Sequence, residues 1–288
     1  MPACFFATDL HGDTTRWGKL FAAAERERPA ALFLGGDLLP GGFGLATMAP
    51  GHRDFVDDFL VVELRRLRAA LGGQAPRVFA ILGNDDPRIE EAAVRAAAAG
   101  ADPVWEYVHD RRVAFGRWAV YGYAYAPPSP FPLKDWERYD VSRYVDPGAV
   151  SPEEGMRTVP VSEAEAKWST IQGDLRSLAG TDDLSDAILL CHAPPYDTPL
   201  DRAALDGRQV EHVPLDVHVG SIALRRFIEA RQPLVTLHGH VHEAVRLTGE
   251  WRVRLGRTWA FGGAHDGPEL ALVRFDPDDP GSATRELL

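Results

Sequence analysis

Short apolar runs alternate with longer stretches of helical spacing over the first hundred residues. Three continuously apolar runs are predicted to be strands, at residues 3–7, 30–34 and 77–82. Three stretches with apolar residues every three or four positions are predicted to be helices, at residues 14–28, 55–71 and 87–99. Strands that alternate with helices in this way predict an α/β fold built on a parallel sheet.

The regular alternation of strand and helix patterns ends in the middle of the chain. Two runs rich in aromatic residues predict strands at residues 104–115 and 118–125. Residues 127–160 contain seven prolines and little periodicity. Loops of this length in a compact domain are usually functional or disordered. Two readings stay open for this segment: an ordered lid, or a surface excursion that its aromatic residues anchor.

The pattern becomes regular again after this segment. A capping box at Ser162 and Glu165 begins a predicted amphipathic helix over residues 162–178, with Trp168 on its apolar face. Buried strands are expected at residues 186–191 and 233–237, separated by a helix that Ser221 caps over residues 221–231. Four short alternating runs predict a closing antiparallel meander, at residues 244–248, 251–255, 258–262 and 269–275.

Composition is that of an ordinary globular protein, with 45% hydrophobic and 25% charged residues. No apolar run approaches the roughly 20 residues that span a bilayer, and the first residues do not resemble a signal peptide. Cys4 and Cys191 lie in apolar runs and are expected to be buried free thiols in the cytoplasm. The formal net charge of −11 argues against membrane or nucleic-acid partners, which need clustered Lys and Arg.

Side chains that can bind metals follow five of the predicted strands. They are Asp9, His11, Asp37, Asn84, His192, His240 and His242. Because ligands bind at the carboxyl ends of strands in open α/β sheets, these groups are expected to converge. Carboxylate, amide and imidazole ligands together suit Mn, Fe, Zn, Co or Ni rather than Ca or Mg alone. The set exceeds what one ion needs, which predicts a two-metal site.

Three histidines lie within five residues in the last of these motifs, from His238 to His242. Gly239 is expected to provide a sharp turn, so that His240 and His242 reach different ions. His238 is expected to point away from the metals, given the alternation of side chains along the preceding strand.

In order and spacing, these motifs resemble the calcineurin-like metallophosphoesterase superfamily, whose motifs are D-x-H, G-D, G-N-[HD], H and G-H-x-H. The matching segments are Asp9-Leu10-His11, Gly36-Asp37, Gly83-Asn84-Asp85, His192 and Gly239-His240-Val241-His242. The resemblance covers nearly the whole chain. It implies a four-layer α-β-β-α sandwich and one domain over residues 1–288, with residues 127–160 as an insertion.

The resemblance also implies an activity and a division of the ligands. One metal ion would be bound by Asp9, His11 and His242, and the second by Asn84, His192 and His240. Asp37 would bridge the two divalent ions, of which manganese is the first candidate. The implied enzyme is a phosphoester hydrolase in which a metal-bridging hydroxide attacks phosphorus in line, acting on a small phosphoester substrate.

One position departs from the common family pattern. Many members have histidine after the asparagine, where this chain has Asp85. A carboxylate there repels a dianionic phosphate, and it could protonate a leaving group only with a raised pKa. We therefore expect phosphodiesters or good leaving groups to be favoured, with Asp85, Asn84 and Asp37 as catalytic candidates. Asp86 is expected to cap the helix that Pro87 begins.

The remaining candidates have weaker claims. Three histidines could orient metal ligands through their second ring nitrogen, namely His212, His218 and His265. His52 and His109 are predicted at the surface. Arg88 could reach a phosphate, but a solvated arginine at a helix start is the favoured interpretation.

Two other functions compete with the small-molecule phosphoesterase. A non-catalytic, metal-binding scaffold of the same fold would be expected to have lost ligands, whereas all seven are present. A protein phosphatase or a nuclease is the other alternative. The protein phosphatases usually keep the histidine that Asp85 replaces, and the acidic balance argues against a nuclease.

Overall fold

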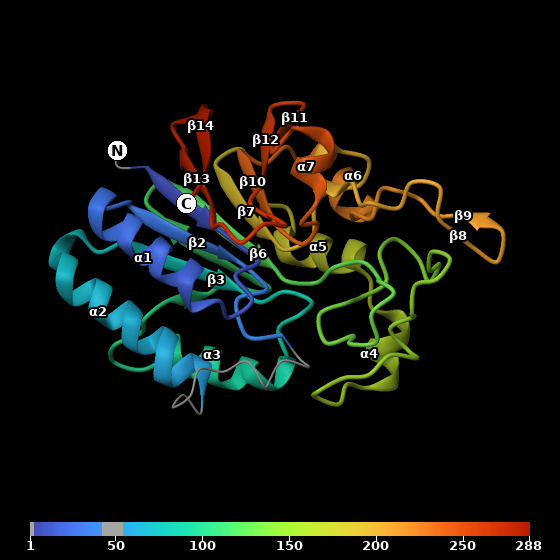
Figure 1. Cartoon of the computed structure of the whole chain (residues 1–288), viewed down its shortest axis with the longest axis horizontal. Coiled ribbons are helices and arrows are strands. Elements are labelled where there is room, and N and C mark those ends of the chain that lie inside the picture. Colours follow the sequence, from blue (N-terminus) through green and yellow to red (C-terminus); the bar gives the residue numbers. More distant parts are fainter. Residues whose placement is uncertain (1–2, 42–53) are drawn as a thin grey trace.

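The computed structural model describes residues 3–41 and 54–288, and its core is a pair of six-stranded sheets (Figure 1). The first sheet contains β1 (Cys4–Ala7), β2 (Ala31–Gly35), β3 (Arg77–Ile81), β4 (Glu106–Tyr107), β13 (Ala271–Asp276) and β14 (Asp279–Leu287). The second contains β5 (Arg111–Phe115), β6 (Trp118–Tyr123), β7 (Ala187–Cys191), β10 (Val235–His238), β11 (Arg252–Leu255) and β12 (Thr258–Gly262). A separate hairpin is formed by β8 (Gln209–Val210) and β9 (Val213–Pro214).

Both sheets have the same plan. The first has the order β14-β13-β1-β2-β3-β4, and the second has the order β11-β12-β10-β7-β6-β5. In each, four neighbouring strands are parallel, from β1 to β4 and across β12, β10, β7 and β6. The remaining strands join antiparallel at the edges. The carboxyl ends of the parallel strands therefore form one edge in each sheet.

Helices cover the outer faces of the two sheets, which gives the four-layer α-β-β-α sandwich that the resemblance implied (Figure 1). The helices over the first sheet are α1 (Thr14–Glu27), α2 (Val61–Leu71) and α3 (Glu91–Ala97). Those on the side of the second sheet are α5 (Ile171–Ala179), α6 (Ile222–Arg231) and α7 (Ala244–Thr248). The short helix α4 (Glu163–Trp168) lies away from that sheet, next to the green segment of Figure 1. Among the described residues, no helix is both long and apolar enough to cross a membrane.

Aromatic side chains fill the space between the sheets. Phe33 and Phe79 of the first sheet stack on each other and both meet the ring of Phe115 from the second. Further along, Phe275 of the first sheet lies 6.0 Å from Phe261 of the second, measured between ring centroids. All five rings are at least nine-tenths buried, so this layer holds the two sheets together as one core.

The strand predicted over residues 104–115 is wrong as a single element. The Val108 N–H still donates to Ala80 in the first sheet, whereas the Asp110 N–H donates to Gly122 in the second. Asp110 has a φ of 51°, which turns the chain between them. The sequence does mark the change of sheet, because Asp110, Arg111 and Arg112 are polar and exposed, and β5 is mostly exposed. The prediction wrongly joined the runs on either side of this polar stretch.

The helix predicted over residues 162–178 is also two elements. Ser169 leaves the helical region, and the Thr170 hydroxyl begins α5 by accepting the Gly173 N–H. The Ile171 N–H donates to the Tyr139 carbonyl, so contact with the preceding segment breaks the helix. Trp168 is 64% exposed rather than on a buried face.

The predicted closing meander is wrong as well. Residues 244–248 form helix α7, which ends at Gly249 with a φ of 77°. The three other runs form strands, but they pair in different sheets, since β11 and β12 join the second and β13 joins the first. The edge strand β14 was not predicted, because its sequence is mostly polar.

Residues 127–160 form neither helix nor strand, as the pattern predicted. Trp136 and Tyr139 are buried and anchor the segment, whereas Tyr144 is 70% exposed. The helix expected over residues 87–99 is shorter, because a 3₁₀ turn (Arg88–Glu90) precedes α3.

Candidate metal centre

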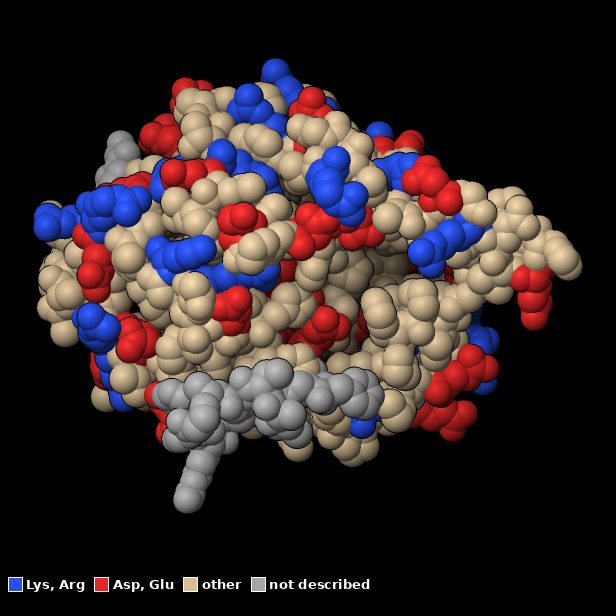
Figure 2. Space-filling view, viewed as in Figure 1, with Lys and Arg blue, Asp and Glu red and all other residues tan. Residues whose placement is uncertain are grey.

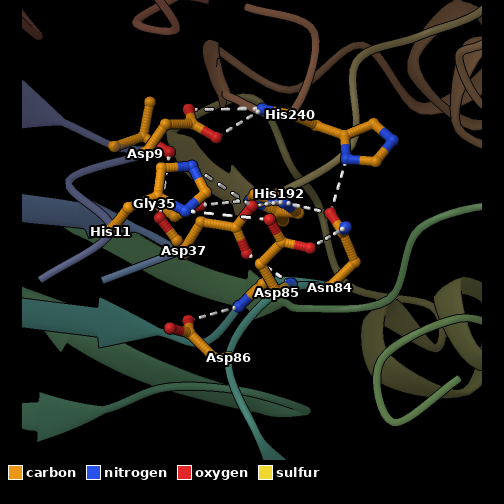
Figure 3. A network of polar contacts seen from close by, with 12 residues as sticks. Asp9, His11, Gly35, Asp37, Asn84, Asp85, Asp86, His192 and His240 are labelled. Atoms are coloured by element: carbon orange, nitrogen blue, oxygen red, sulfur yellow. Dashed lines mark hydrogen bonds and ion pairs between the residues drawn. The ribbon is translucent and has the colours of Figure 1, made fainter. Parts of the chain in front are cut away.

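The structure brings all seven predicted ligands together where the strands of both sheets end. Figure 3 labels all of them except His242. Asp9 and His11 follow β1, Asp37 follows β2 and Asn84 follows β3, so four come from the first sheet. His192 follows β7, and His240 and His242 follow β10, so three come from the second. The site therefore lies at the seam between the two sheets.

Four of these residues adopt left-handed backbone conformations. The φ angles are 56° for Asp9, 46° for His11, 51° for Asp37 and 74° for His240. Residues other than glycine seldom adopt such angles, and strained residues of this kind cluster at functional sites. The turn expected at Gly239 is made by His240 itself.

Glycines in the same motifs allow close approach instead. A Cβ atom at Gly239 would collide with the side chains of Thr8 and Asp9. At Gly36 it would lie 2.6 Å from His192 Nδ1, and at Gly83 it would lie 2.6 Å from the Asp37 nitrogen. Because these distances leave no room for a side chain, the three glycines let the ligand loops touch.

One group of donor atoms comprises Asp9, His11, Asp37 and His242. Each contributes an oxygen or ring nitrogen, and these atoms all lie within 4.8 Å of one another. His11 Nε2 is 3.2 Å from His242 Nε2, and His242 Nε2 is 3.3 Å from Asp9 Oδ1. Asp9 also accepts the His240 N–H at 3.0 Å, which ties the β1 and β10 loops together.

A second group surrounds the side-chain oxygen of Asn84. That Oδ1 atom lies 2.9 Å from His192 Nε2 and 2.6 Å from His240 Nδ1. Asn84 Nδ2 donates to Asp85, which turns the amide oxygen toward the imidazoles. Asp37 Oδ2 is 3.3 Å from His192 Nε2 and 4.0 Å from His11 Nε2, so one oxygen faces both groups.

The donor chemistry of this cluster fits cations. His192 Nδ1 lies 2.9 Å from the Gly35 carbonyl, which can only accept, so Nδ1 carries a proton. In neutral imidazole, His192 Nε2 would then point a lone pair at the oxygens of Asn84 and Asp37. Bare lone pairs that face one another are stabilised either by a proton or by a metal ion between them.

Charges within the cluster shift its pKa values in the absence of bound cations. Burial disfavours ionisation of Asp9 and Asp37, yet the neighbouring imidazoles hold the pKa of both carboxyls below its usual range. Burial likewise opposes protonation of His192, but Asp37 raises the pKa of His192 to about 10. The hydrogen bond with Asp9 raises the pKa of His242 to about 9 against the same opposition. Burial and the charge of His192 lower the pKa of His240 to about 4.

Asp86 does not cap a helix, contrary to the sequence prediction. Its fully buried carboxylate accepts the N–H groups of Gly83 at 2.8 Å, Leu39 at 2.8 Å and Leu38 at 3.2 Å. These bonds join the Asp37 loop to the Asn84 loop. Burial and the charge of Asp37 raise the pKa of Asp86 to about 8. The sequence offered no signal for this role, because an aspartate before proline is also a common cap.

Asp85 lies at the outer side of the cluster, with 46% of its side chain exposed. Its N–H donates to Asp37 at 2.8 Å, and its carboxylate is 3.7 Å from His11 Nδ1. Burial and the charge of Asp37 raise the pKa of Asp85. The residue therefore adds negative charge at the accessible edge of the site.

Arg16 is a supporting residue that the sequence did not indicate. It donates to the Asp9 carbonyl at 2.9 Å and to the Gly267 carbonyl at 2.5 Å. These two bonds hold the left-handed turn at Asp9 against the loop that precedes β13.

His109 is buried, so its predicted surface position is wrong. Its Nδ1 accepts the Ala124 N–H at 3.1 Å, and the ring meets Trp136 and Tyr125. Burial lowers the pKa of His109 to about 3. The residue is a neutral part of the core beside residues 127–160.

The other histidines lie apart from the ligand contacts. His238 is buried and engages the Ala193 carbonyl and the Thr236 hydroxyl, which agrees with the expectation that it points away. His218 contacts Asp201, His265 contacts Glu269, and His212 is exposed in the β8–β9 turn. None of the three contacts a predicted ligand in the part of the chain that is described. His52 lies outside the described residues.

Arg88 is not the solvated arginine that the sequence favoured. Its N–H donates to Asp135 at 2.8 Å, and its guanidinium lies 5.3 Å from the Trp136 ring centroid and 3.5 Å from Glu165. The side chain is 22% exposed and belongs to the contact between α3 and residues 127–160.

Figure 2 shows a hollow right of centre, on the side where the strand ends face the green segment of Figure 1. Acidic side chains lie beside the hollow. Lysines and arginines are scattered among acidic residues over this face rather than gathered into one basic stripe.

The chain is similar to known proteins both in sequence pattern and in structure. The family profile described as calcineurin-like phosphoesterase matches residues 5–244, whereas no curated protein matches the chain. The solved structure of TT1561 from Thermus thermophilus is 16% identical, with a TM-score of 0.55 over 99% of this chain and 98% of that one. A dimetal phosphatase from Danio rerio is 14% identical, with a TM-score of 0.47 over 94% of each chain. From the profile match, the chain belongs to the calcineurin-like phosphoesterase family.

Proposed function

We propose that this protein hydrolyses small phosphoesters with two divalent metal ions bound at the seam of its sheets. The observation that carries the proposal is the pair of donor groups that share one oxygen of Asp37. The proposed ligands are Asp9, His11 and His242 for one ion, Asn84, His192 and His240 for the other, and Asp37 for both. Manganese is the first candidate metal. Because each sheet supplies ligands, we treat residues 1–288 as one functional domain.

Two bound cations would lower the pKa of a water molecule between them and offset negative charge on the phosphoryl oxygens. The protein's part is to hold the ligands in place beforehand. The Gly35 carbonyl fixes the His192 ring, and Asp85 fixes the Asn84 amide. The left-handed turns at Asp37 and His240 hold their side chains in the cluster. Such preorganisation avoids reorganisation during the reaction.

We further propose that Asp85 favours phosphodiesters over monoesters. A diester carries one negative charge and a monoester up to two, so an adjacent carboxylate repels the monoester more strongly. Burial and the charge of Asp37 raise the pKa of Asp85, and bound cations would offset the second of these causes. We propose substrate selection rather than proton donation as the role of Asp85, because its carboxylate lies at the accessible edge of the site. Residues 127–160 are proposed to shape the leaving-group side of the site.

An activity panel tests the function. Metal-free protein is supplied with Mn²⁺ or Ni²⁺ and assayed on bis-p-nitrophenyl phosphate and on alkyl and aryl monophosphates. We expect metal-dependent hydrolysis that Asp37→Ala abolishes and that Glu25→Ala, a change at an exposed position of α1, leaves intact. Diesters should have the higher kcat/KM.

The same panel separates the alternatives. Two bound metal ions without hydrolysis of any ester would favour the non-catalytic scaffold. Hydrolysis of phosphopeptides alone would favour a protein phosphatase. Equal kcat/KM on the diester and on alkyl monophosphates would refute the proposed selectivity while leaving the phosphoesterase assignment in place.

A further inference from the structure

Residues 134–140, here called the bridging stretch, are bonded both to the turn that follows the Asn84 loop and to the start of α6. In the middle, the stretch pairs with the chain just after β6, where the Ala126 N–H donates to the Trp136 carbonyl at 2.9 Å. The Arg138 N–H returns to the Ala126 carbonyl at 3.0 Å. Its two ends carry carboxylates, Asp135 and Asp140, that bind opposite sides of the site.

Asp135 binds the turn that follows the Asn84 loop of the first sheet. Its fully buried carboxylate accepts the Arg88 N–H at 2.8 Å and the Thr158 N–H at 2.8 Å. The Thr158 hydroxyl donates to Asp135 and accepts the Ile89 N–H at 3.0 Å. These are the first N–H groups of the helical turn after Asn84, where Pro87 provides no side-chain cap. Asp135 thus performs the capping that the sequence assigned to Asp86.

Asp140 binds the start of α6, beside the His192 loop of the second sheet. Its carboxylate accepts the Ser221 hydroxyl at 2.5 Å, the Ile222 N–H at 2.7 Å and the Ala223 N–H at 3.2 Å. Ser221 is also bound to the loop after His192, because its own N–H donates to the Pro194 carbonyl at 2.9 Å. Asp140 therefore fixes the start of α6 and, through it, the His192 loop.

Buried contacts make the bridging stretch rigid. Lys134 and Glu137 form an ion pair in which both side chains are fully buried, and Glu137 also accepts the Ser129 N–H at 2.7 Å. The Trp136 side chain is fully buried, and the guanidinium of Arg138 lies 3.9 Å from the centroid of the Tyr125 ring. Movement at one end should therefore be transmitted to the other.

We propose that Asp135 and Asp140 are positioning residues that set the separation of the Asn84 and His192 loops. The inference rests on the proposed function, in which Asn84 and His192 bind the same ion. These ligands come from different sheets, yet their donor atoms are 2.9 Å apart. The bridging stretch connects the elements that follow both loops. The Asp9 loop has a support of its own outside the bridging stretch, because Arg16 donates to the Asp9 carbonyl and to the Gly267 carbonyl.

Titration of the metal-free full chain with Mn²⁺, by calorimetry and electron paramagnetic resonance, tests the inference. The wild type should bind two equivalents and show a spin-coupled pair. Asp135→Ala and Asp140→Ala should weaken one equivalent about tenfold or more, as loss of residues that orient ligands commonly does. The other equivalent should change little. Asp135→Asn and Asp140→Asn, which retain an acceptor oxygen, should recover part of the loss.

Reference variants identify the affected ion. Asn84→Ala should remove the same equivalent, and Asp135→Ala should cause no further loss in its background. Glu154→Ala is the matched control, because that carboxylate is exposed and accepts the Ser151 hydroxyl at 3.0 Å, three residues away in the same segment. Hydrogen exchange at Ile89 and Ile222 should accelerate in the alanine variants, which verifies that the anchors have been released.

The outcomes are distinct. Wild-type affinity for both equivalents despite faster exchange would overturn the positioning role alone, as would equal weakening of both. If the alanine variants do not fold, the two asparagine variants decide the question. Metal titrations equal to the wild type would refute the positioning role, and weaker binding of one equivalent alone would support it. A wild type that binds fewer than two equivalents would overturn the proposed function, and this inference with it.

Discussion

Two neighbouring aspartates in the Asn84 loop have the same side chain and opposite environments. Asp85 is half-exposed at the edge of the metal centre, whereas Asp86 is fully buried beneath it and accepts three backbone N–H groups. We therefore expect substitutions of Asp85 to change which substrates are hydrolysed, and substitutions of Asp86 to change the free energy of unfolding.

Asp85→Asn removes the charge and retains the shape. We expect kcat/KM for monoesters to rise about tenfold relative to diesters, equivalent to about 1.4 kcal/mol of relieved repulsion. Activity on bis-p-nitrophenyl phosphate should persist. Should diester turnover instead collapse for poor leaving groups, with loss of one limb of the pH profile, Asp85 would be a proton donor. Asp85→His supplies a donor without the negative charge and distinguishes the two roles.

Asp86→Ala leaves three buried N–H groups without their acceptor. We expect the free energy of unfolding to fall by about 3 kcal/mol or more, because each such group costs about 1–3 kcal/mol to bury. Asp86→Asn, with one acceptor oxygen, should fall between Asp86→Ala and the wild type. Asp85→Ala is the matched control and should change stability by less than about 0.5 kcal/mol. Urea denaturation of metal-free protein measures all three, and equal losses at the two positions would contradict this account.

The clustering of the candidate ligand residues could be predicted from sequence, whereas the residues that support them could not. Asp, Asn and His at strand ends are visible in the pattern, since the ends of parallel strands meet at one edge. Asp86, Asp135 and Arg16 act through bonds to backbone groups that lie far away in the chain. No spacing rule encodes such contacts. The left-handed turn at His240 was missed because glycine, at position 239, is the usual residue for that conformation.

At the scale of elements, the link between β4 and β5 shows why the sequence pattern failed there. His109 lies where the chain passes from one sheet to the other, and the exposed residues Asp110, Arg111 and Arg112 follow it. A short polar stretch can lie within one edge strand as well as between two strands, so it did not by itself separate the two elements. The helix at residues 162–178 failed for a related reason, because pairing with Tyr139 overrides helical periodicity at Thr170. Local periodicity predicted most elements, but it could not predict which sheet each would join.

His109 should make stability depend on pH. Its folded pKa of about 3 lies below the ordinary value of 6.5, so the unfolded chain binds the proton first as pH falls. Stability is therefore lost as pH falls from about 6.5 toward 3, by up to about 1.4 kcal/mol per pH unit from this residue. Asn at this position can accept the Ala124 N–H and does not titrate.

Denaturation at several pH values between 6 and 4 measures this contribution. The slope of stability against pH should be shallower in His109→Asn than in the wild type. His212→Asn, in the exposed β8–β9 turn, should retain the wild-type slope. A parallel pair of curves for wild type and His109→Asn would show that His109 is not held neutral.

At the scale of the whole molecule, the two sheets contribute groups of opposite charge to the candidate metal centre. The carboxylates of Asp9 and Asp37 come from the first sheet, and the imidazoles of His192 and His242 come from the second. In metal-free protein the raised pKa values of both histidines place protons at the seam. Protons thus balance the carboxylates until cations replace them.

If cations replace the protons on His192 and His242, metal binding should release protons to the solvent. Because His192 and His242 have pKa values of about 10 and about 9, both are protonated at pH 7.5, and each must become neutral to bind a metal. About two protons should therefore leave when Mn²⁺ fills both positions. The apparent affinity for Mn²⁺ should rise with pH and level off once pH exceeds the histidine pKa values.

Calorimetry in two buffers of different ionisation enthalpy counts the released protons, and the His242→Ala variant should release about one proton fewer than the wild type. Binding at pH 7.5 without proton release would mean that both histidines are already neutral in the metal-free protein. Protonated histidines would then not be what balances the charge of Asp9 and Asp37 before metal binds.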